Sequence, residues 1–245
     1  MANAQKPRAE SPKRKKICIP SELTYMLAVV LLSLAVAILT SVNFGISMIV
    51  APAYLLSLKV GVITFGQAEY IIQAGLFVVL CLVLRGFRPI YLMSFVTCLI
   101  YGAVLDMWRM LPCFNSAVTK PGSMDLRLRI FLFVIGVLLT SFSVALFFKT
   151  YLYPQVYDFF VKAVSFKYGI RISVFKTYFD LTLLLIGTVM TLCFFGKFEA
   201  LNWGTLIMAT LNGTVIGFFS KQLDRFFEFR PVFKGFSSYF KLNKK

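Results

Sequence analysis

Six apolar segments, each long enough to cross a lipid bilayer, constrain this 245-residue chain more than any other feature. A spanning helix needs about 20 largely apolar residues, because the hydrocarbon core is about 30 Å thick and a helix rises about 1.5 Å per residue. Hydrophobic residues make up 59% of the sequence, whereas soluble domains have roughly 45–50%. The fold class is therefore predicted to be an all-α polytopic membrane protein with six transmembrane helices. We place them at Tyr25–Val50, Phe65–Leu84, Pro89–Met110, Ile130–Phe148, Val174–Phe195 and Leu201–Phe219.

These segments divide the chain into three regions. A basic tail covers 1–23, a six-helix transmembrane domain covers 24–220, and a basic, aromatic tail covers 221–245. The longest polar connection has about two dozen residues, so we expect no separate soluble domain. The first apolar segment is too long for the core of a signal peptide, and we expect it to be retained as a helix.

Basic residues are divided unevenly between the two sides that six crossings define. The net charge is +16, and nineteen Lys and Arg residues fall in 1–23, 85–88, 149–171 and 221–245. Six fall on the opposite side: Lys59, Arg109, Lys120, Arg127, Arg129 and Lys197. Because cytoplasmic loops carry the excess of Lys and Arg, we predict a bacterial inner-membrane protein with both termini in the cytoplasm. The basic tails then contact anionic lipid, and we expect no nucleic-acid partner.

Several kinds of chemistry are excluded by the residue types that the chain lacks. It has no histidine, which removes imidazole metal sites and Ser-His-Asp or Cys-His nucleophiles. Its five cysteines include no C-x-x-C pair, so neither disulfides nor metal ligation are expected. The sequence also lacks a glycine loop of the kind that binds phosphate. We predict a protein that is not an enzyme and that uses no metal or cofactor.

The first three segments and the last three resemble each other. Leu39-Thr40-Ser41 recurs as Leu139-Thr140-Ser141, and a connector that contains a proline, Pro52 or Pro154, follows each. Because each half, about 24–110 and 128–220, has three crossings, the second half is inverted relative to the first. We therefore predict a 3+3 inverted repeat, a design in which secondary transporters bind substrates at the repeat interface.

The connectors are predicted to form short amphipathic helices, on the membrane surface or tucked into the bundle. Apolar residues recur at helical spacing across 154–168, and 51–59 is a shorter candidate on the opposite side. A further amphipathic helix is predicted over 226–240, where phenylalanines alternate with basic residues.

Several short motifs are shared with a known family. They are Thr64-Phe65-Gly66-Gln67-Ala68-Glu69-Tyr70, Tyr101-Gly102-Ala103-Val104-Leu105-Asp106, Tyr151-Leu152-Tyr153-Pro154-Gln155-Val156-Tyr157 and Trp203-Gly204-Thr205. On these motifs the chain resembles the YczE/YyaS/YitT-like bacterial integral membrane proteins, and most closely the YczE branch. The resemblance runs from about Val29 to Phe227 and implies a fold and a membrane location, but no substrate. The turn at Ala51-Pro52-Ala53-Tyr54 departs from the commoner family pattern, so no ligand role is carried over to it.

Two ionisable residues, Asp180 and Lys176, lie inside the fifth predicted span. Asp180 is about two turns into the helix, and Lys176 precedes it by four residues, so both lie on one face and can pair. An ionisable group inside a bilayer costs at least roughly 2.5–3.5 kcal/mol, so each needs a partner or a purpose. One interpretation is a structural ion pair that anchors the helix at the interface. The other is that Asp180 lines a polar cavity and couples a substrate to a proton or cation; contact with a lipid headgroup is a third.

Glu69 and Gln73 make the start of the second predicted span the most polar helix entrance in the chain. They are one turn apart on the same face. A carboxylate in a first turn is favoured by the helix dipole, which is a sufficient structural reason for Glu69. Contact with a ligand is the alternative. If the repeat is real, Gln73 corresponds by position to Asp180, and both would lie at the interface between the halves.

The remaining candidates have simpler interpretations. Asp106 and Arg109, at the end of the third span, are predicted to form an interfacial ion pair. Gly213 and Gly217 have the G-x-x-x-G spacing and are predicted to form a close-packing face on the sixth helix.

Transport of a small molecule or ion across the membrane is the function that these features favour. Asp180, Lys176, Glu69 and Gln73 would then line the pathway. A non-transporting scaffold or accessory subunit that supports a partner, through the basic aromatic tail after Lys221, is the alternative. The bilayer is the one partner that both interpretations require.

Overall fold

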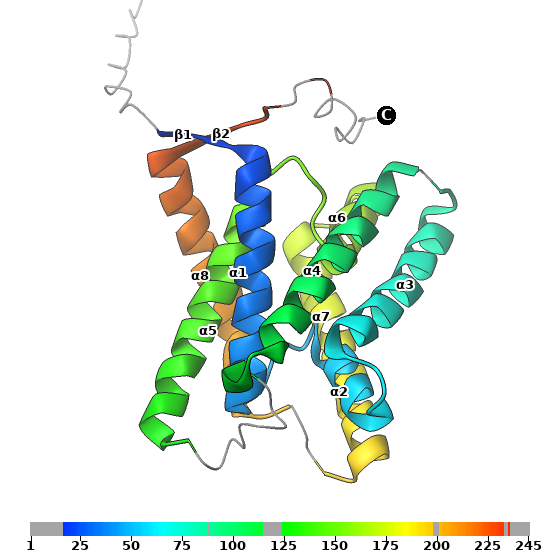
Figure 1. The fold of residues 1–245 in the computed structure, drawn as a ribbon. Helices are drawn as coiled ribbons and strands as arrows, with labels where there is room; N and C mark the ends of the chain where they lie inside the picture. The colour runs from blue at the N-terminus through cyan, green and yellow to red at the C-terminus, as the bar shows by residue number, and fades with distance from the viewer. Residues whose placement is uncertain (1–16, 88, 115–123, 198–200, 233–234, 236–245) are drawn as a thin grey trace, which may run out of the picture.

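The protein is an all-α membrane protein with six helices long and apolar enough to span a bilayer, as its computed structural model shows (Figure 1). The structure describes residues 17–87, 89–114, 124–197, 201–232 and 235. The candidate spans are α1 (Ser21–Val42), α3 (Phe65–Leu84), α4 (Leu92–Met110), α5 (Leu126–Phe147), α7 (Ile172–Phe195) and α8 (Trp203–Phe226). Two shorter helices, α2 (Ala51–Val60) and α6 (Val156–Tyr168), lie near opposite ends of the bundle. Single 3-10 turns, η1 (Pro89–Tyr91) and η2 (Pro112–Phe114), flank α4.

The first span is shorter than the sequence pattern predicts. α1 ends at Val42 rather than at Val50, because Asn43 adopts a left-handed conformation with φ 53° and Gly45 follows with φ 115°. The chain turns at Gly45 against the start of α8, where an added Cβ would lie 2.7 Å from the backbone nitrogen of Thr205. Residues 51–60 then form α2, which contains Pro52 in its first turn. The predicted run was apolar throughout, so its hydropathy did not reveal the break.

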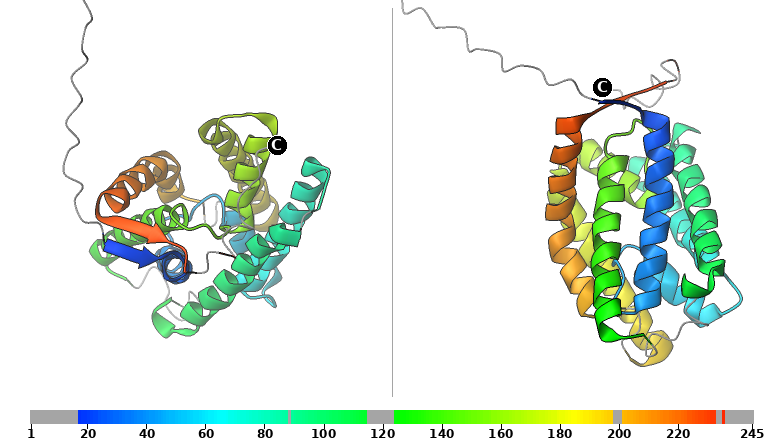
Figure 2. Two further views of the ribbon diagram at one scale, coloured as in Figure 1. Left: turned by 90° about the horizontal axis from the view of Figure 1, so that it is seen from above. Right: turned by 60° about the vertical axis from the view of Figure 1, so that its left-hand side comes forward.

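Five helices form a row, and three others close it on one side. Neighbours in the row are α8, α5, α1, α4 and α3, and α6 and α2 pack against α3. α7 packs against both α2 and α6. Seen from above, α1, α5 and α8 gather on one side of the molecule and α6 and α7 on the other (Figure 2, left). Over their described lengths, α7 and α8 make no extensive contact, so the ring of helices is open between them.

The described ends of the chain meet at one end of the bundle. β1 (Ile17–Pro20) pairs in parallel with β2 (Phe227–Arg230), so the prediction of a helix over 226–240 is wrong for 227–230. α8 itself continues to Phe226, beyond the predicted Phe219, and residues 236–245 lie outside the described part of the chain. The Glu22 carboxylate accepts hydrogen bonds from the Val232 backbone N–H at 3.0 and 3.1 Å and from the Tyr151 hydroxyl at 2.7 Å. Burial, assisted by Glu22, raises the pKa of Tyr151 to about 12, so this hydroxyl remains a donor at neutral pH.

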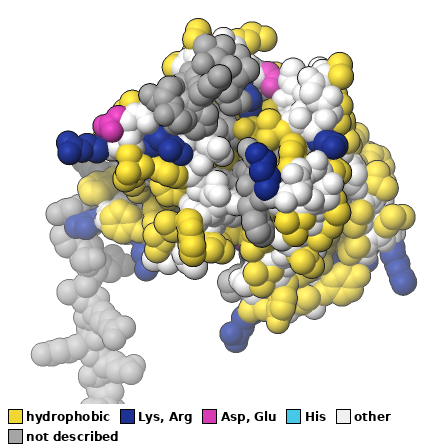
Figure 3. All heavy atoms as spheres, turned by 90° about the horizontal axis from the view of Figure 1, so that it is seen from below, with side chains coloured by type: hydrophobic (Ala, Val, Ile, Leu, Met, Phe, Trp, Pro, Cys, Tyr) yellow, Lys and Arg dark blue, Asp and Glu magenta, His cyan; other side chains and the backbone are white. Residues whose placement is uncertain are grey.

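The opposite end, where α2 lies, carries isolated Lys and Arg side chains among apolar ones (Figure 3). Arg129 donates to the carbonyl oxygen of Val42 at 3.0 and 3.2 Å and lies over the ring of Phe44, 4.3 Å from its centre. Lys59 donates to the carbonyl oxygen of Phe194 at 3.2 Å and so joins α2 to the end of α7. Arg129 and Lys59 therefore satisfy carbonyl oxygens at the ends of α1 and α7 at this face.

Glycines bring α3 and α4 together, and they are not the glycines that the sequence suggested. A Cβ at Gly66 would collide with the carbonyl oxygen of Gly102, and a Cβ at Gly102 would collide with the Tyr70 ring. At Gly213 and Gly217, by contrast, a Cβ would meet nothing within 4 Å among the described residues. Gly213 and Gly217 therefore pack against no other described part of the chain, and their close-packing role stays a prediction.

Alanine at these glycines is expected to have opposite effects. Gly102→Ala should lower the free energy of unfolding by about 1–3 kcal/mol, since the new methyl group must displace the Tyr70 ring. Gly213→Ala should leave it unchanged or raise it by up to about 1 kcal/mol, because alanine favours the helix and meets no neighbour. Thermal unfolding of both variants in detergent measures the difference. A loss of stability in Gly213→Ala would show that this face packs against something, such as a second copy of the chain.

Candidate functional site

A small cavity lies at the centre of the bundle, between the row of helices and the helices that close it. Its volume is about 60 Å³. Its apolar wall comes from α1, α5 and α8. Its polar lining comes from α4 to α8 and from the loops that precede α2 and α6: Ser47, Tyr101, Thr140, Gln155, Tyr157, Asp158, Lys176 and Asn212. Asn212 is itself held by the Ser141 hydroxyl, which donates to its Oδ1 at 2.6 Å. The cavity is therefore a chamber with several polar groups in a mostly apolar wall.

An ion cluster of three residues lies at one side of this cavity. Lys176 Nζ is 3.5 Å from Asp158 Oδ1 and 3.5 Å from Asp180 Oδ1. The i, i+4 pair within α7 matches the sequence prediction, whereas the contribution of Asp158 from the first turn of α6 was not predicted. The three side chains are 21–29% exposed, so the cluster is neither sealed nor fully open. Two carboxylates on one ammonium give it a net negative charge.

A second polar group, formed by hydrogen bonds around Glu69, lies on the other side of α6. Glu69 and Gln73 are both 0% exposed. Gln73 Nε2 and the Tyr157 hydroxyl donate to Glu69 Oε2 at 3.0 and 3.1 Å. Gln73 also donates to Gln155 Oε1 at 3.3 Å and accepts from the Val156 backbone N–H at 3.1 Å. α3 and the start of α6 are therefore held together by Gln73.

Glu69 does not cap its helix, which was one of the two roles considered for it. Thr64 and Gln67 form a reciprocal capping box at the start of α3, with Gln67 N–H donating to the Thr64 hydroxyl at 3.1 Å. Asp106, on α4, reinforces this end by accepting from the Thr64 hydroxyl at 2.6 Å and from the Gly66 backbone N–H at 2.9 Å. With the helix end already satisfied, the Glu69 carboxyl is free to face the protein interior.

The predicted pair of Asp106 and Arg109 stays a prediction. Asp106 accepts hydrogen bonds from the start of α3. The Arg109 guanidinium lies over the rings of Tyr54 and Phe65, 5.6 and 5.5 Å from their centres. Both residues therefore help to join α2, α3 and α4, away from the central cavity.

The two polar groups occupy corresponding positions in α3 and α7. Glu69 and Gln73 are the fifth and ninth residues of α3, and Lys176 and Asp180 are the fifth and ninth residues of α7. Each i, i+4 pair contacts the first turn of α6, through Gln155, Val156 and Tyr157 in one case and through Asp158 in the other. The four candidates from the sequence therefore converge on one short segment, which lines the cavity.

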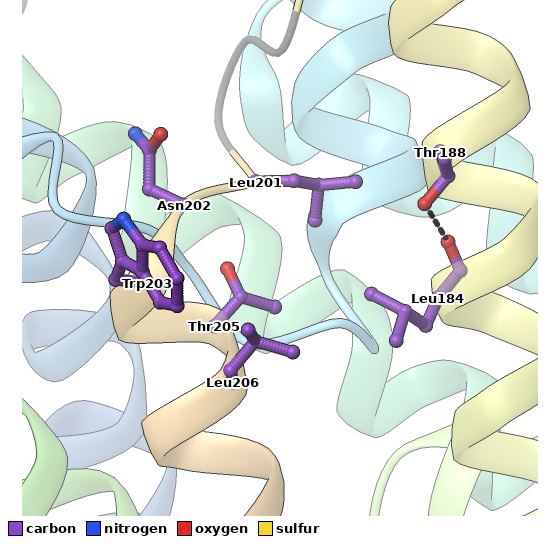
Figure 4. A pocket seen from close by; sticks show the side chains of 7 residues that line it. All are labelled: Leu184, Thr188, Leu201, Asn202, Trp203, Thr205 and Leu206. Carbon is purple, nitrogen blue, oxygen red and sulfur yellow. Dashed lines mark hydrogen bonds between the residues drawn. The ribbon is translucent and has the colours of Figure 1, made fainter.

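A groove leads into the bundle where the ring of helices is open. Its volume is about 390 Å³, and it is lined by Leu184 and Thr188 of α7 and by residues 201–203, 205 and 206 at the start of α8. In Figure 4, α7 and the start of α8 face each other across this groove, and the Thr188 hydroxyl donates to the carbonyl oxygen of Leu184 at 2.8 Å, within its own helix. Thr188 therefore satisfies its hydroxyl locally and leaves the groove walls largely apolar.

The residues that sequence analysis did not select are those of the α6 start. Gln155, Tyr157 and Asp158 line the cavity and touch both polar groups. They were visible as part of a shared motif and as the acidic start of an amphipathic segment, but the sequence left open whether this segment lies on the membrane surface or inside the bundle. Among the described residues, no cluster of three or more His, Cys, Asp or Glu side chains could hold a metal ion.

The fold, with six helices long and apolar enough to span a bilayer, is that of a multi-pass integral membrane protein. Residues 19–221 match the model of a family of unknown function, DUF6198, and the chain belongs to this family. No curated protein and no solved structure matches the chain.

Proposed function

We propose that this protein transports a small polar solute or ion across a bacterial inner membrane, with both termini in the cytoplasm. The observation that carries the proposal is the central cavity inside a bundle of apolar helices, lined by Asp158 and Lys176 of the ion cluster and by Gln155 and Tyr157, which bond to Gln73 and Glu69. Charged groups at such positions are costly and typically mark substrate or ion pathways. A volume of about 60 Å³ corresponds to a nearly closed chamber that must widen before a solute enters.

The pattern of helix contacts supports an inverted repeat and a rocking motion. If α1 to α4 correspond to α5 to α8, then contacts α1–α4, α2–α3 and α3–α6 each have a counterpart in α5–α8, α6–α7 and α7–α2. Two pairs differ: α3 and α6 both pack against α4, whereas over the described residues their counterparts α7 and α2 make no extensive contact with α8, and α7 and α8 are apart along the groove. In a transporter built from inverted repeats, exchanging these two arrangements would close one access route and open the other. The kinship with YczE-like proteins, which is part of the same proposal, agrees with the extent of the shared motifs.

A ligand that occupies the cavity is expected to stabilise the protein, and Asp180→Asn is expected to remove that effect. The purified chain is screened by thermal unfolding in detergent against amino acids, carboxylic acids, polyamines, sugars and alkali cations. Mass action gives about 2.7 kcal/mol of stabilisation at a hundredfold excess over the Kd. Hits are then tested for uptake into proteoliposomes under an imposed ion gradient.

The matched control is Thr210→Val, on the exposed side of α8, where the hydroxyl bonds within its own helix. It should retain both the thermal shift and uptake. A flat response across the whole panel, with Asp180→Asn as stable as the natural protein, would argue against transport and favour the scaffold role. In that case partner capture with and without residues 231–245 becomes the decisive measurement.

A further inference from the structure

The Glu69 carboxyl has two oxygens in very different surroundings. Oε2 accepts two hydrogen bonds, from Gln73 Nε2 at 3.0 Å and from the Tyr157 hydroxyl at 3.1 Å. Oε1 is buried and has no hydrogen-bond partner among the described residues. A carboxylate spreads its charge over both oxygens and attracts donors to each, whereas a protonated carboxyl has one carbonyl oxygen that accepts and one hydroxyl. Two donors on Oε2 and none on Oε1 fit a neutral acid whose carbonyl oxygen is Oε2 and whose proton is on Oε1.

The groups that face Glu69 from the neighbouring helices provide no positive charge. From α4 come Cys98, whose thiol lies 3.9 Å from the Glu69 carbonyl oxygen, and Tyr101, whose buried hydroxyl has no partner in the described structure. Asp106 and Arg109 lie further along α4, at the start of α3 and over the α2–α3 rings.

The other two helices packed on α3 do not supply a cation either. From α6 comes Tyr157, and Lys167 of the same helix donates to the Val83 carbonyl oxygen at the other end of α3. Lys176 of α7 is already shared by Asp158 and Asp180. From α2, Lys59 reaches the end of α7 instead. An ionised Glu69 would therefore be a buried charge without a counterion, which is much less favourable than a neutral carboxyl.

We propose that Glu69 carries the coupling ion of this transporter, a proton bound to Oε1. This inference rests on the proposed function. Tyr101 and Tyr157 both line the central cavity and both lie beside Glu69, so they mark the route by which water reaches the carboxyl when the cavity widens. The Oε1–H bond then breaks, the proton passes to a cavity water, and the carboxylate left behind keeps the Tyr157 and Gln73 hydrogen bonds. Asp180 stays paired with Lys176 throughout and contacts the solute.

Infrared difference spectroscopy of the full chain tests this proposal. The protein is measured in dodecyl maltoside, which has no carbonyl group, as the buffer is taken from neutral to alkaline pH. The natural protein and Asp180→Asn should both lose a protonated-carboxyl C=O band, which also shifts in D₂O, and Glu69→Gln should show no such band. The absence of the band in the natural protein, or its persistence in Glu69→Gln, would overturn the proposal.

Two further measurements keep the test decisive. Glutamine mimics the neutral acid, so Glu69→Gln should unfold within about 2 °C of the natural protein. Tyr157→Phe removes one donor to the ionised form, so its band should disappear at a pH higher by about one unit. If Glu69→Gln is not recovered folded, Tyr157→Phe decides alone, and an unmoved band contradicts the proposal.

Proteoliposomes containing a pH-sensitive dye separate this inference from the proposed function. The Glu69 band could be present while no compound of the panel drives proton movement. That result would support the proton site at Glu69 and contradict proton-coupled transport. If Glu69→Gln takes up solute with the same pH dependence as the natural protein, the proposed transport function stands. The role of Glu69 as the coupling site is then contradicted.

Discussion

Replacing Lys176 by methionine is expected to lower the free energy of unfolding by about 3 kcal/mol. The substitution leaves Asp158 and Asp180 side by side without their shared cation, and removing one member of a buried ion pair costs about 3–5 kcal/mol. We expect the lower end of that range, because the three side chains are 21–29% exposed. Thermal and chemical unfolding in detergent measure the loss.

The rescue of this variant separates charge from packing. Adding Asp158→Asn and Asp180→Asn to Lys176→Met removes the repulsion, so the triple variant should recover most of the lost stability while remaining unable to bind a solute. Lys162→Met, on the exposed side of α6, is the matched control and should change stability by less than about 0.5 kcal/mol. Equal destabilisation of the single and triple variants would mean that the Lys176 side chain acts by packing and not by its charge.

Replacing Gln73 by leucine is expected to lower the free energy of unfolding by about 3 kcal/mol, through a different mechanism. The amide makes three hydrogen bonds in a fully buried site: to Glu69, to Gln155 and from the backbone N–H of Val156. Each partner loses a bond worth about 1 kcal/mol, and the buried N–H is left unsatisfied. Because Gln73 also positions the start of α6, ligand-induced stabilisation should be lost together with fold stability.

Thr182→Val provides the comparison for Gln73→Leu. Its hydroxyl bonds to the Tyr178 carbonyl oxygen within α7, on an exposed face, so the loss of one polar group there should cost little. If Gln73→Leu proved as stable as Thr182→Val, the hydrogen bonds between α3 and α6 would not be what holds these helices together. The polar network would then have to be explained by function alone.

Some features of the site were readable from local spacing. Lys176 and Asp180 share a helix face because they are four residues apart, and this contact requires no knowledge of the other helices. The same spacing placed Glu69 and Gln73 together. What each pair faces was not readable, because the partners belong to another helix: Tyr157 lies 88 residues after Glu69, and Asp158 lies in α6, before the turn that leads to Lys176.

Other local patterns have more than one structural solution. The alternation of aromatic and basic residues after α8 suits a strand as well as an amphipathic helix, and pairing with Ile17–Pro20 selects the strand. Gly213 and Gly217 have the spacing of a packing motif, but the face of α8 that packs against α5 is a different one. Gly66 and Gly102, which have no such spacing, are the residues that allow close approach.

The sequence by itself determined that this is a six-helix membrane protein, where most of its spans lie, and which side chains share a helix face. Those properties depend on the length and hydropathy of single segments, since each spanning helix must satisfy its own backbone hydrogen bonds. The tertiary structure alone decided that the first turn of α6 enters the bundle, that Asp158 joins Lys176, and that Glu69 is sealed among neutral groups. Burial and pairing are set by side chains from other helices, and no local pattern records which helices those will be.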